Sequence, residues 1–444
     1  MSVQQYLQHY AEPETRSIEA GENYYDFILS IPAFNEPDTF VERIKNLNTS
    51  QSVLVILVVN APDQIDDIEK LYRTQALAKK LHETYPLLET YTDSMHLLEL
   101  NQSLSQHLLL VERCCEGQLI PVKEGVGLAR KIGCDIACKL IARARISCPW
   151  IFTTDADVSL PEGYFTAADS LIAMEVGAGL YPFHHQSNSD KIINLSQNLY
   201  ELSLYYYVEG LRSANSLYAF HTIGSTLVIN FHVYGLARGF PKRAAGEDFY
   251  LLNKMSKIAD IELLAGPTIN IDSRVSDRVP FGTGPAINKI SQLASPLNDY
   301  LYYNPLCFEY LKACLLLLPK LWGLKELAES LPPCDLIEKL LIAIEADLSL
   351  NTKIDLSLLG QALKSLGANK ALTHSYQHSH SDITFSQHMN NWFDAFKTLK
   401  FIHFIRENGA SSINAKTLLA ETGFLSNKLK ARFEFEIAQE DTSN

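Results

Sequence analysis

Two short apolar runs near the start of the chain constrain its fold more than any other feature. Residues 26–33 (DFILSIPA) and 53–59 (VLVILVV) are apolar on both faces instead of alternating with polar residues. Strands of this kind occur in largely parallel sheets that helices cover on both sides. The residues between the runs have helical apolar spacing at Phe40, Ile44 and Leu47. We therefore expect the core to begin with a βαβ unit.

Further apolar patterns predict a series of elements after this unit. In chain order they are a mostly helical stretch without a strand at 64–113, a strand at 119–122, a helix at 126–144, a strand at 150–154, a helix at 190–212, a strand at 225–230, a helix at 247–257 and a loop at 268–285. Alternating strands and helices are typical of α/β folds. We expect a mixed, mostly parallel sheet flanked by helices.

The pattern changes after residue 290, where three or four amphipathic helices and no strand are predicted. The longest apolar stretch, at 307–324, contains Glu309, Lys312 and Lys320, so we expect a buried helix there and no membrane-spanning segment. The predicted organisation is a polar N-terminal tail (1–24), an α/β domain (25–289) and an α-helical C-terminal region (290–444).

Composition and charge exclude several classes of protein. Of the 444 residues 47% are apolar, which is enough to offset the entropy of ordering the chain. The 51 acidic and 38 basic residues give a net charge of −13, which argues against a protein that binds nucleic acid through its phosphates. The N-terminus has neither a basic segment nor an apolar core, so we expect a cytoplasmic protein. Eight cysteines are too few for a disulfide scaffold, and we expect reduced thiols.

The strongest local motif is Asp155-Ala156-Asp157, directly after the predicted strand at 150–154. Ligand crevices of open α/β sheets lie at the carboxyl ends of the strands. Two neighbouring carboxylates repel one another, and a hard divalent cation such as Mg²⁺ relieves that repulsion. The alternative is an ordinary turn, because aspartate is frequent in turns.

A second acidic pair, Glu247-Asp248, opens the helix predicted at 247–257. Acidic residues in a first helical turn interact favourably with the helix dipole, which is a purely structural explanation. A carboxylate in a site can instead accept the proton of an attacking hydroxyl. The spacing alone does not decide between the two.

Two basic or glycine-containing patterns suggest phosphate binding. Arg274 and Arg278 lie four residues apart in a Gly- and Ser-containing stretch, where guanidinium groups suit phosphate, although surface arginines are common. Gly125-x-Gly127 opens a helix after a predicted strand, but Arg130 stands where a dinucleotide-binding motif has its third glycine. We therefore do not expect a Rossmann oxidoreductase.

Histidines form two further groups, His184-His185 and His374, His378 and His380. Their spacing would allow metal binding, but no carboxylate or cysteine pattern completes either group. For the second group we expect a solvated polar loop within residues 373–390.

Four motifs in a fixed order together resemble the family 2-like glycosyltransferases of the GT-A fold. They are Ser30–Glu36 (SIPAFNE), Gly125–Gly133 (GVGLARKIG), Thr154–Asp157 (TDAD) and Ala245–Asp248 (AGED). The resemblance covers roughly residues 25–285. It implies a GT-A domain that transfers a sugar from a nucleotide-diphosphate sugar to an acceptor hydroxyl, with Mn²⁺ or Mg²⁺ as cofactor.

The resemblance also implies roles for individual residues. Asp157 would bind the metal, with Asp155 contacting the ribose or assisting at the metal, and Asp248 would be the base, with Glu247 beside it. Glu36 would lie near the ribose or base and Arg278 near the diphosphate. The nucleotide-sugar-binding set that it implies is Pro32, Ala33, Asn35, Glu36, Asn60, Arg130, Asp155, Arg274 and Arg278.

Some features depart from the family pattern or leave alternatives open. The turn after the second strand is Asn60-Ala-Pro-Asp63, without the usual Asp-Asp-Gly-Ser-like sequence, so the nucleotide is not defined. Without membrane helices or the signature of processive synthases, we expect a non-processive enzyme. A single displacement would invert the anomeric configuration, and retention stays open. A nucleotidyltransferase, a non-catalytic scaffold and peripheral contact with a membrane also stay open.

Overall fold

We describe the fold from a computed structural model of the chain. The structure describes residues 2–18, 23–47, 49–172, 174–186, 189–272, 282–344 and 354–441. The chain divides into two compact units, Met1–Asn188 with Thr222–Pro285, and Ser189–His221 with Ala286–Asn444. This division differs from the predicted boundaries because Ser189–His221 belongs to the second unit.

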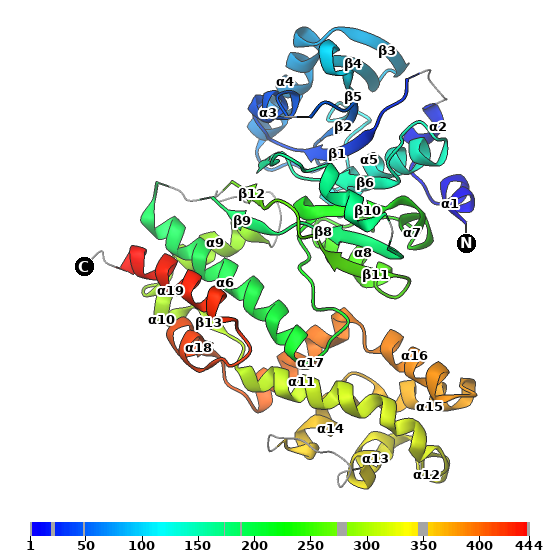
Figure 1. Cartoon of the computed structure of the whole chain (residues 1–444), viewed down its shortest axis with the longest axis vertical. Helices are drawn as coiled ribbons and strands as arrows, with labels where there is room; N and C mark the ends of the chain where they lie inside the picture. Colours follow the sequence, from blue (N-terminus) through cyan, green and yellow to red (C-terminus); the bar gives the residue numbers. More distant parts are fainter. Residues whose placement is uncertain are drawn as a thin grey trace. The chain divides into compact units, whose positions relative to one another are not determined.

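A nine-stranded mixed sheet forms the centre of the first unit (Figure 1). In spatial order its strands are β11 (Asp260–Leu263), β8 (Val176–Leu180), β10 (Leu227–Asn230), β6 (Trp150–Thr153), β1 (Phe27–Ala33), β2 (Val53–Asn60), β5 (Gln106–Arg113), β4 (Met95–Asn101) and β3 (Leu87–Thr92). Of these nine described strands seven run in one direction, and β10 and β4 run against them. The predicted α/β class, with a large mixed sheet flanked by helices, is confirmed.

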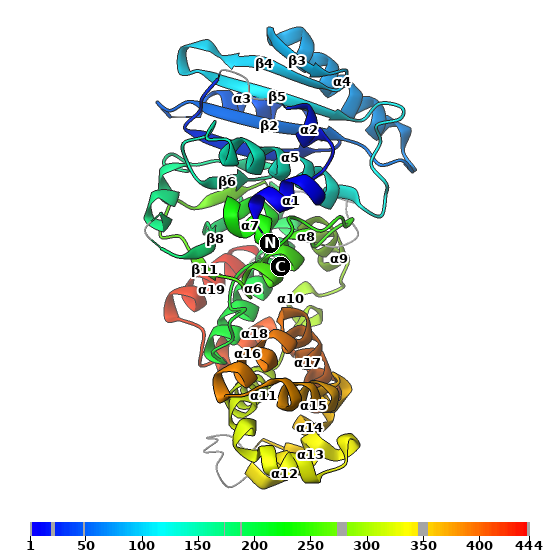
Figure 2. The ribbon, with the colours of Figure 1, turned by 90° about the vertical axis from the view of Figure 1, so that its right-hand side faces the viewer.

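The βαβ unit at the centre of this sheet is confirmed. Every residue of β1 and of β2 is buried, and the two strands pair in parallel from Phe27 opposite Val53. The helix α3 (Thr39–Lys45) connects them. Helices α3 and α4 (Ile68–Thr84) cover one face of this part of the sheet, and α5 (Gly125–Ala142) covers the other (Figures 1 and 2).

Two predictions about residues 64–122 are wrong. After α4 the chain forms the strands β3, β4 and β5, and β5 is the parallel neighbour of β2. The expected strand at 119–122 is reduced to a single bridge between Ile120 and Pro62. Leucine-rich runs such as HLLLV at 107–111 fit a helix or a strand equally well, and pairing with β2 decides the outcome.

The predicted N-terminal tail contains two helices, α1 (Val3–His9) and α2 (Glu14–Ser17), which contact α5. Tyr6 is fully buried, and its hydroxyl donates a hydrogen bond to Asp135 of α5. Tertiary contacts of a few side chains order a segment whose overall composition is polar.

A small second sheet completes the first unit next to the Asp155-Ala156-Asp157 turn. It consists of β7 (Val158–Ser159), β12 (Ile269–Ile271) and β9 (Phe183–His185). The loop predicted at 268–285 therefore contains a strand, and its residues 273–281 lie outside the described residues. Two further helices of this unit are α7 (Phe231–Leu236) and α8 (Glu247–Met255), and α9 (Thr283–Ser291) follows them.

The second unit is helical around one apolar core. Its helices are α6 (Lys191–Ser213), α10 (Pro296–Asp299), α11 (Pro305–Leu317), α12 (Lys325–Ser330), α13 (Leu336–Ile344), α14 (Leu356–Ser365), α15 (Ala368–His378), α16 (Asp382–Trp392), α17 (Ala395–Asn408), α18 (Ala415–Glu421) and α19 (Asn427–Asp441). Helix α6 belongs here because Leu199, Leu202 and Tyr206 are buried in that core. Among the described helices, none is both long and apolar enough to cross a membrane.

Two expectations for this region are corrected. The sequence predicts a loop for the histidine-containing stretch at 373–390, but α15 and α16 occupy most of it. Tyr376 of α15 and Phe385 and Met389 of α16 are buried in the core. The region also contains two very short strands, β13 (Leu301–Tyr302) and β14 (Ile413–Asn414), which pair antiparallel.

Candidate functional site

A buried arginine connects two of the predicted acidic motifs. Arg130 of α5 is 2% exposed in its side chain, and its guanidinium lies 2.6 Å from Asp155 Oδ1 and 3.0 Å from Glu247 Oε1. It also donates to Thr153 Oγ1 at 3.0 Å and to the Gly224 carbonyl at 3.3 Å. Burial lowers the pKa of Arg130, but the two carboxylates outweigh it, and the net pKa is raised. Four protein acceptors surround this guanidinium, so it positions Asp155 and Glu247 instead of presenting itself to solvent.

The second acidic motif lies at the first turn of α8. Gly246 precedes the helix in a left-handed conformation (φ 71°), which glycine adopts without steric cost. The Glu247 side chain is 5% exposed, whereas Asp248 is partly exposed to solvent. Desolvation and then repulsion by Glu247 raise the pKa of Asp248 to about 7, although a hydrogen bond from the Phe249 amide opposes this.

These groups leave an excess of negative charge at one edge of the sheet. Asp155, Glu247 and Asp248 influence one another electrostatically, and Arg130 supplies the positive charge among them. A carboxyl with a pKa near neutrality is well suited to exchange protons at physiological pH. The arrangement therefore combines a carboxylate that Arg130 holds in place, Asp155, with a candidate proton acceptor, Asp248.

Glycines at the start of α5 explain how the two motifs come together. A Cβ atom on Gly127 would lie 2.6 Å from the backbone of Arg243 and of Pro241. The amide of Gly127 donates to the Arg243 carbonyl at 2.9 Å. Gly125-x-Gly127 thus allows the chain segment that leads into α8 to lie directly on α5. This close packing accounts for the glycines without a dinucleotide.

The Asp155-Ala156-Asp157 turn is held from several sides. The Asp157 carbonyl accepts a hydrogen bond from the Asp272 amide at 2.9 Å, next to the pairing of β7 with β12. Arg43 of α3 donates to the Ala156 carbonyl at 2.9 Å and lies 3.2 Å from the Asp272 carboxylate. Sequence analysis missed Arg43, because a basic residue in the last turn of a helix is explained by the helix dipole.

The predicted nucleotide-binding residues of β1 and β2 lie at the carboxyl ends of these strands. Pro32 and Ala33 are buried within β1, and Glu36 is buried just after it. Asn35 adopts a left-handed conformation (φ 55°), and its backbone amide donates a hydrogen bond to Thr74 Oγ1. The Asn60 side-chain amide donates to the carbonyls of Ala33 and Val58, so part of its hydrogen-bonding capacity joins β1 to β2.

The other predicted phosphate-binding residues cannot be placed relative to this cluster from the described part of the chain. Arg274 and Arg278 lie outside the described residues. Within the described part of the chain, three or more metal-ligand side chains come together in two places, His82 with His96 and Glu112, and Glu112 with Cys114 and Cys115. Neither group contains one of the histidines or carboxylates that the sequence patterns singled out.

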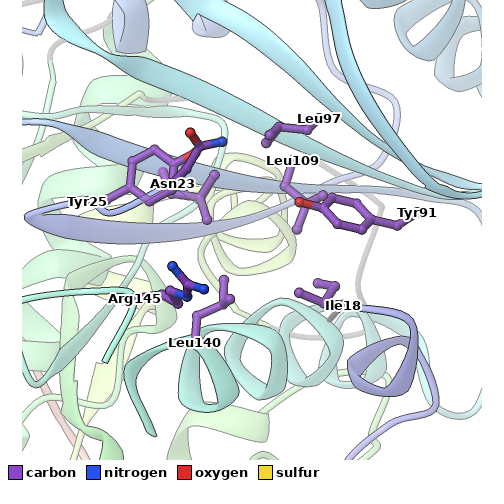
Figure 3. A pocket seen from close by; sticks show the side chains of 9 residues that line it. Ile18, Asn23, Tyr25, Tyr91, Leu97, Leu109, Leu140 and Arg145 are labelled. Atoms are coloured by element: carbon purple, nitrogen blue, oxygen red, sulfur yellow. The ribbon is translucent and has the colours of Figure 1, made fainter. Parts of the chain in front are cut away.

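A small cavity of about 30 Å³ lies elsewhere in the first unit, where side chains of the sheet and of the end of α5 face one another (Figure 3). Tyr25 and Leu54, from the amino ends of β1 and β2, line it together with Leu140 and Arg145. Because β1, β2 and β6 are parallel, this cavity is at the opposite edge of the sheet from Asp155. It contains none of the predicted site residues.

Comparison with known proteins gives no further assignment: no protein-family model matches this chain, and no curated protein matches it. The functional roles of the site residues therefore remain predictions from the motifs and the geometry.

Proposed function

We propose that this protein is a metal-dependent glycosyltransferase that moves a sugar from a nucleotide-diphosphate sugar to an acceptor hydroxyl, with inversion and without processivity. The observation that carries the proposal is the cluster around Arg130. It joins Asp155 at the carboxyl end of β6 to Glu247 beside Asp248, whose pKa is raised to about 7. The four ordered motifs that resemble GT-A glycosyltransferases support the same assignment.

The ligand atoms that the Asp155-Ala156-Asp157 turn offers suit Mn²⁺ or Mg²⁺, because both side chains are carboxylates with oxygen ligands only. Asp157 would hold the ion, with Asp155 beside it, its Oδ1 oriented by Arg130. When bound, such a cation neutralises negative charge on the departing nucleotide diphosphate.

The residues of the chain would supply the other steps. In its carboxylate form Asp248 accepts the proton of the acceptor hydroxyl while the hydroxyl oxygen attacks the anomeric carbon and the bond to the diphosphate breaks. Desolvation, and then the Glu247 carboxylate, keep the pKa of Asp248 high enough for this transfer. We propose that the buried segment Pro32–Glu36 and Asn60 form the floor beneath the nucleotide.

The test is incubation of the full chain with a panel of UDP- and GDP-sugars and Mn²⁺ or Mg²⁺. We expect release of a nucleoside diphosphate, slow hydrolysis without acceptor, and loss of the cation dependence in Asp157→Ala. Release of pyrophosphate would indicate a nucleotidyltransferase. If the folded protein neither binds nor turns over any donor, the proposal is wrong and a non-catalytic role is favoured.

A further inference from the structure

Three side chains with metal-binding chemistry converge far from the Asp155 turn along the sheet. His82 lies in the last turn of α4, His96 in β4 and Glu112 in β5. Figure 1 shows these three elements at the same end of the large sheet. His96 is paired with Leu110, two residues before Glu112, so His96 and Glu112 project from the same face of the sheet. His82 reaches them from α4, which covers that face.

The ligand atoms are close enough to share one ion. One atom from each of His82, His96 and Glu112 lies within 4.8 Å of the others. Glu112 Oε1 is 2.8 Å from His82 Nε2 and 3.5 Å from His96 Nδ1. Ligand atoms around a tetrahedral Zn²⁺ are roughly 3.3–3.6 Å apart, given bonds of about 2.0–2.2 Å. The 3.5 Å distance falls within that range and the 2.8 Å distance is shorter than it, so small side-chain rotations would complete the geometry.

One atom of the group is otherwise unexplained. His96 Nδ1 is buried, and although Glu112 Oε1 lies 3.5 Å away, it makes no hydrogen bond of adequate geometry among the described residues. Buried polar atoms are nearly always paired with protein, water or an ion. The group is accessible from solvent, since the side chain of His82 is 33% exposed and those of His96 and Glu112 are each 15% exposed, which leaves a path for an ion and for a water ligand.

We propose that His82, His96 and Glu112 form a binding site for a divalent transition-metal ion of the Zn²⁺ type. Two imidazoles and one carboxylate suit Zn²⁺, whereas Mg²⁺ and Ca²⁺ prefer oxygen ligands throughout. This site is chemically distinct from the Asp155 turn. A bound ion would fasten the end of α4 to the β4–β5 pair.

The experiment is titration of the full chain with Zn²⁺ by calorimetry and with Co²⁺ by visible absorption. An Asp155→Asn/Asp157→Asn background removes the carboxylates of the other proposed cation site. We expect one equivalent to bind in this background with nitrogen–oxygen coordination bands. His96→Ala and Glu112→Gln should each weaken binding at least about 100-fold, because loss of a ligand exceeds the usual effect of an outer-shell change.

His232→Ala is the matched control, because it removes an exposed histidine of the same unit and should leave binding unchanged. Zn²⁺ should raise the unfolding temperature of the wild-type chain but not of His96→Ala. His82→Gln, at a more accessible position, provides a second variant if His96→Ala does not fold. Three outcomes would overturn the proposal: no binding of Zn²⁺ or Co²⁺, binding that the ligand substitutions do not change, or a thiolate-to-Co²⁺ band lost in Cys115→Ser.

Discussion

Two neighbouring residues of α5, Arg130 and Lys131, are both buried cations, but their surroundings differ. Lys131 lies 2.8 Å from the fully buried Asp135, which also accepts hydrogen bonds from Tyr6 and Tyr234. In that cluster the Glu12 carboxylate also lies 4.0 Å from Lys131 and 3.5 Å from Lys242, and Asp135 has no access to solvent. Each of these two carboxylates therefore has a cation close to it, which is typical of a group that holds structure together.

The cluster around Arg130 has the opposite character. It contains more carboxylates than cations, and Asp155 keeps 35% of its side chain exposed. Desolvation and then repulsion by Glu247 raise the pKa of Asp248, which lies beside this cluster. Strongly perturbed carboxyl groups at an accessible edge are typical of functional sites. We infer that, of these two adjacent residues of α5, Lys131 stabilises the fold and Arg130 positions the carboxylates of the candidate site.

The sharpest test of this comparison is Asp248→Asn. If Asp248 is the proton acceptor, sugar transfer should fall by about 10²–10⁴-fold, the usual contribution of a general base. Stability should be retained or rise, because the amide removes a desolvated carboxyl beside Glu247. Initial rates with a donor and acceptor, together with urea unfolding, measure both. Full activity in the variant would contradict the assignment.

Asp135→Ala should show the reverse pattern. Removing this carboxylate takes away the nearest negative charge of the buried Lys131 and leaves it the Glu12 carboxylate at 4.0 Å; breaking a buried pair in this way typically costs about 3–5 kcal/mol in the free energy of unfolding. Urea denaturation measures the loss. The control is Glu83→Gln, at an exposed pair with Lys79, where we expect a change of at most about 0.5 kcal/mol. Equal effects at the two positions would show that the Lys131 cluster is not structural.

The parts of this arrangement that depend on local patterns could be predicted from the sequence. The strands β1, β2 and β6 and the helix α5 follow from apolar spacing, and the position of Asp155 follows from its place after β6. The start of α8 at Glu247 was predicted in the same way.

The parts that depend on distant contacts could not be predicted. The bond from Tyr6 to Asp135 spans 129 residues, and that from Arg130 to Glu247 spans 117. The leucine-rich sequences of β4 and β5 fit a helix as well as a strand until their pairing partners are known. The proximity of His96 and Glu112 could therefore not be predicted either. Periodicity reports which face of a segment is buried, but not what buries it.

Gly127→Ala tests the packing that brings the two acidic motifs together. The added Cβ would lie 2.6 Å from backbone atoms of Arg243 and Pro241, so the segment leading to α8 must shift. We expect a loss of about 1–3 kcal/mol in unfolding free energy, as for other overpacked positions. Transfer activity should fall as well, because Glu247 moves away from Arg130. Gly323→Ala is the control, because a Cβ there meets nothing within 4 Å and Gly323, like Gly127, has no positive φ.

The pH dependence tests the role of Asp248 in a second way. Because the pKa of Asp248 is raised from 3.8 to about 7, the folded state holds a proton that the unfolded state releases between these values. Asp248 therefore costs no stability below pH 4, destabilises the fold increasingly as pH rises toward 7, and adds no further change above it. Activity should run the other way: kcat/KM should fall about tenfold per pH unit below 7, since only the carboxylate accepts a proton. Urea unfolding between pH 4 and 8 should show the Asp248 contribution in the wild-type chain and not in Asp248→Asn, and an activity profile flat through pH 7 would exclude Asp248 as the base.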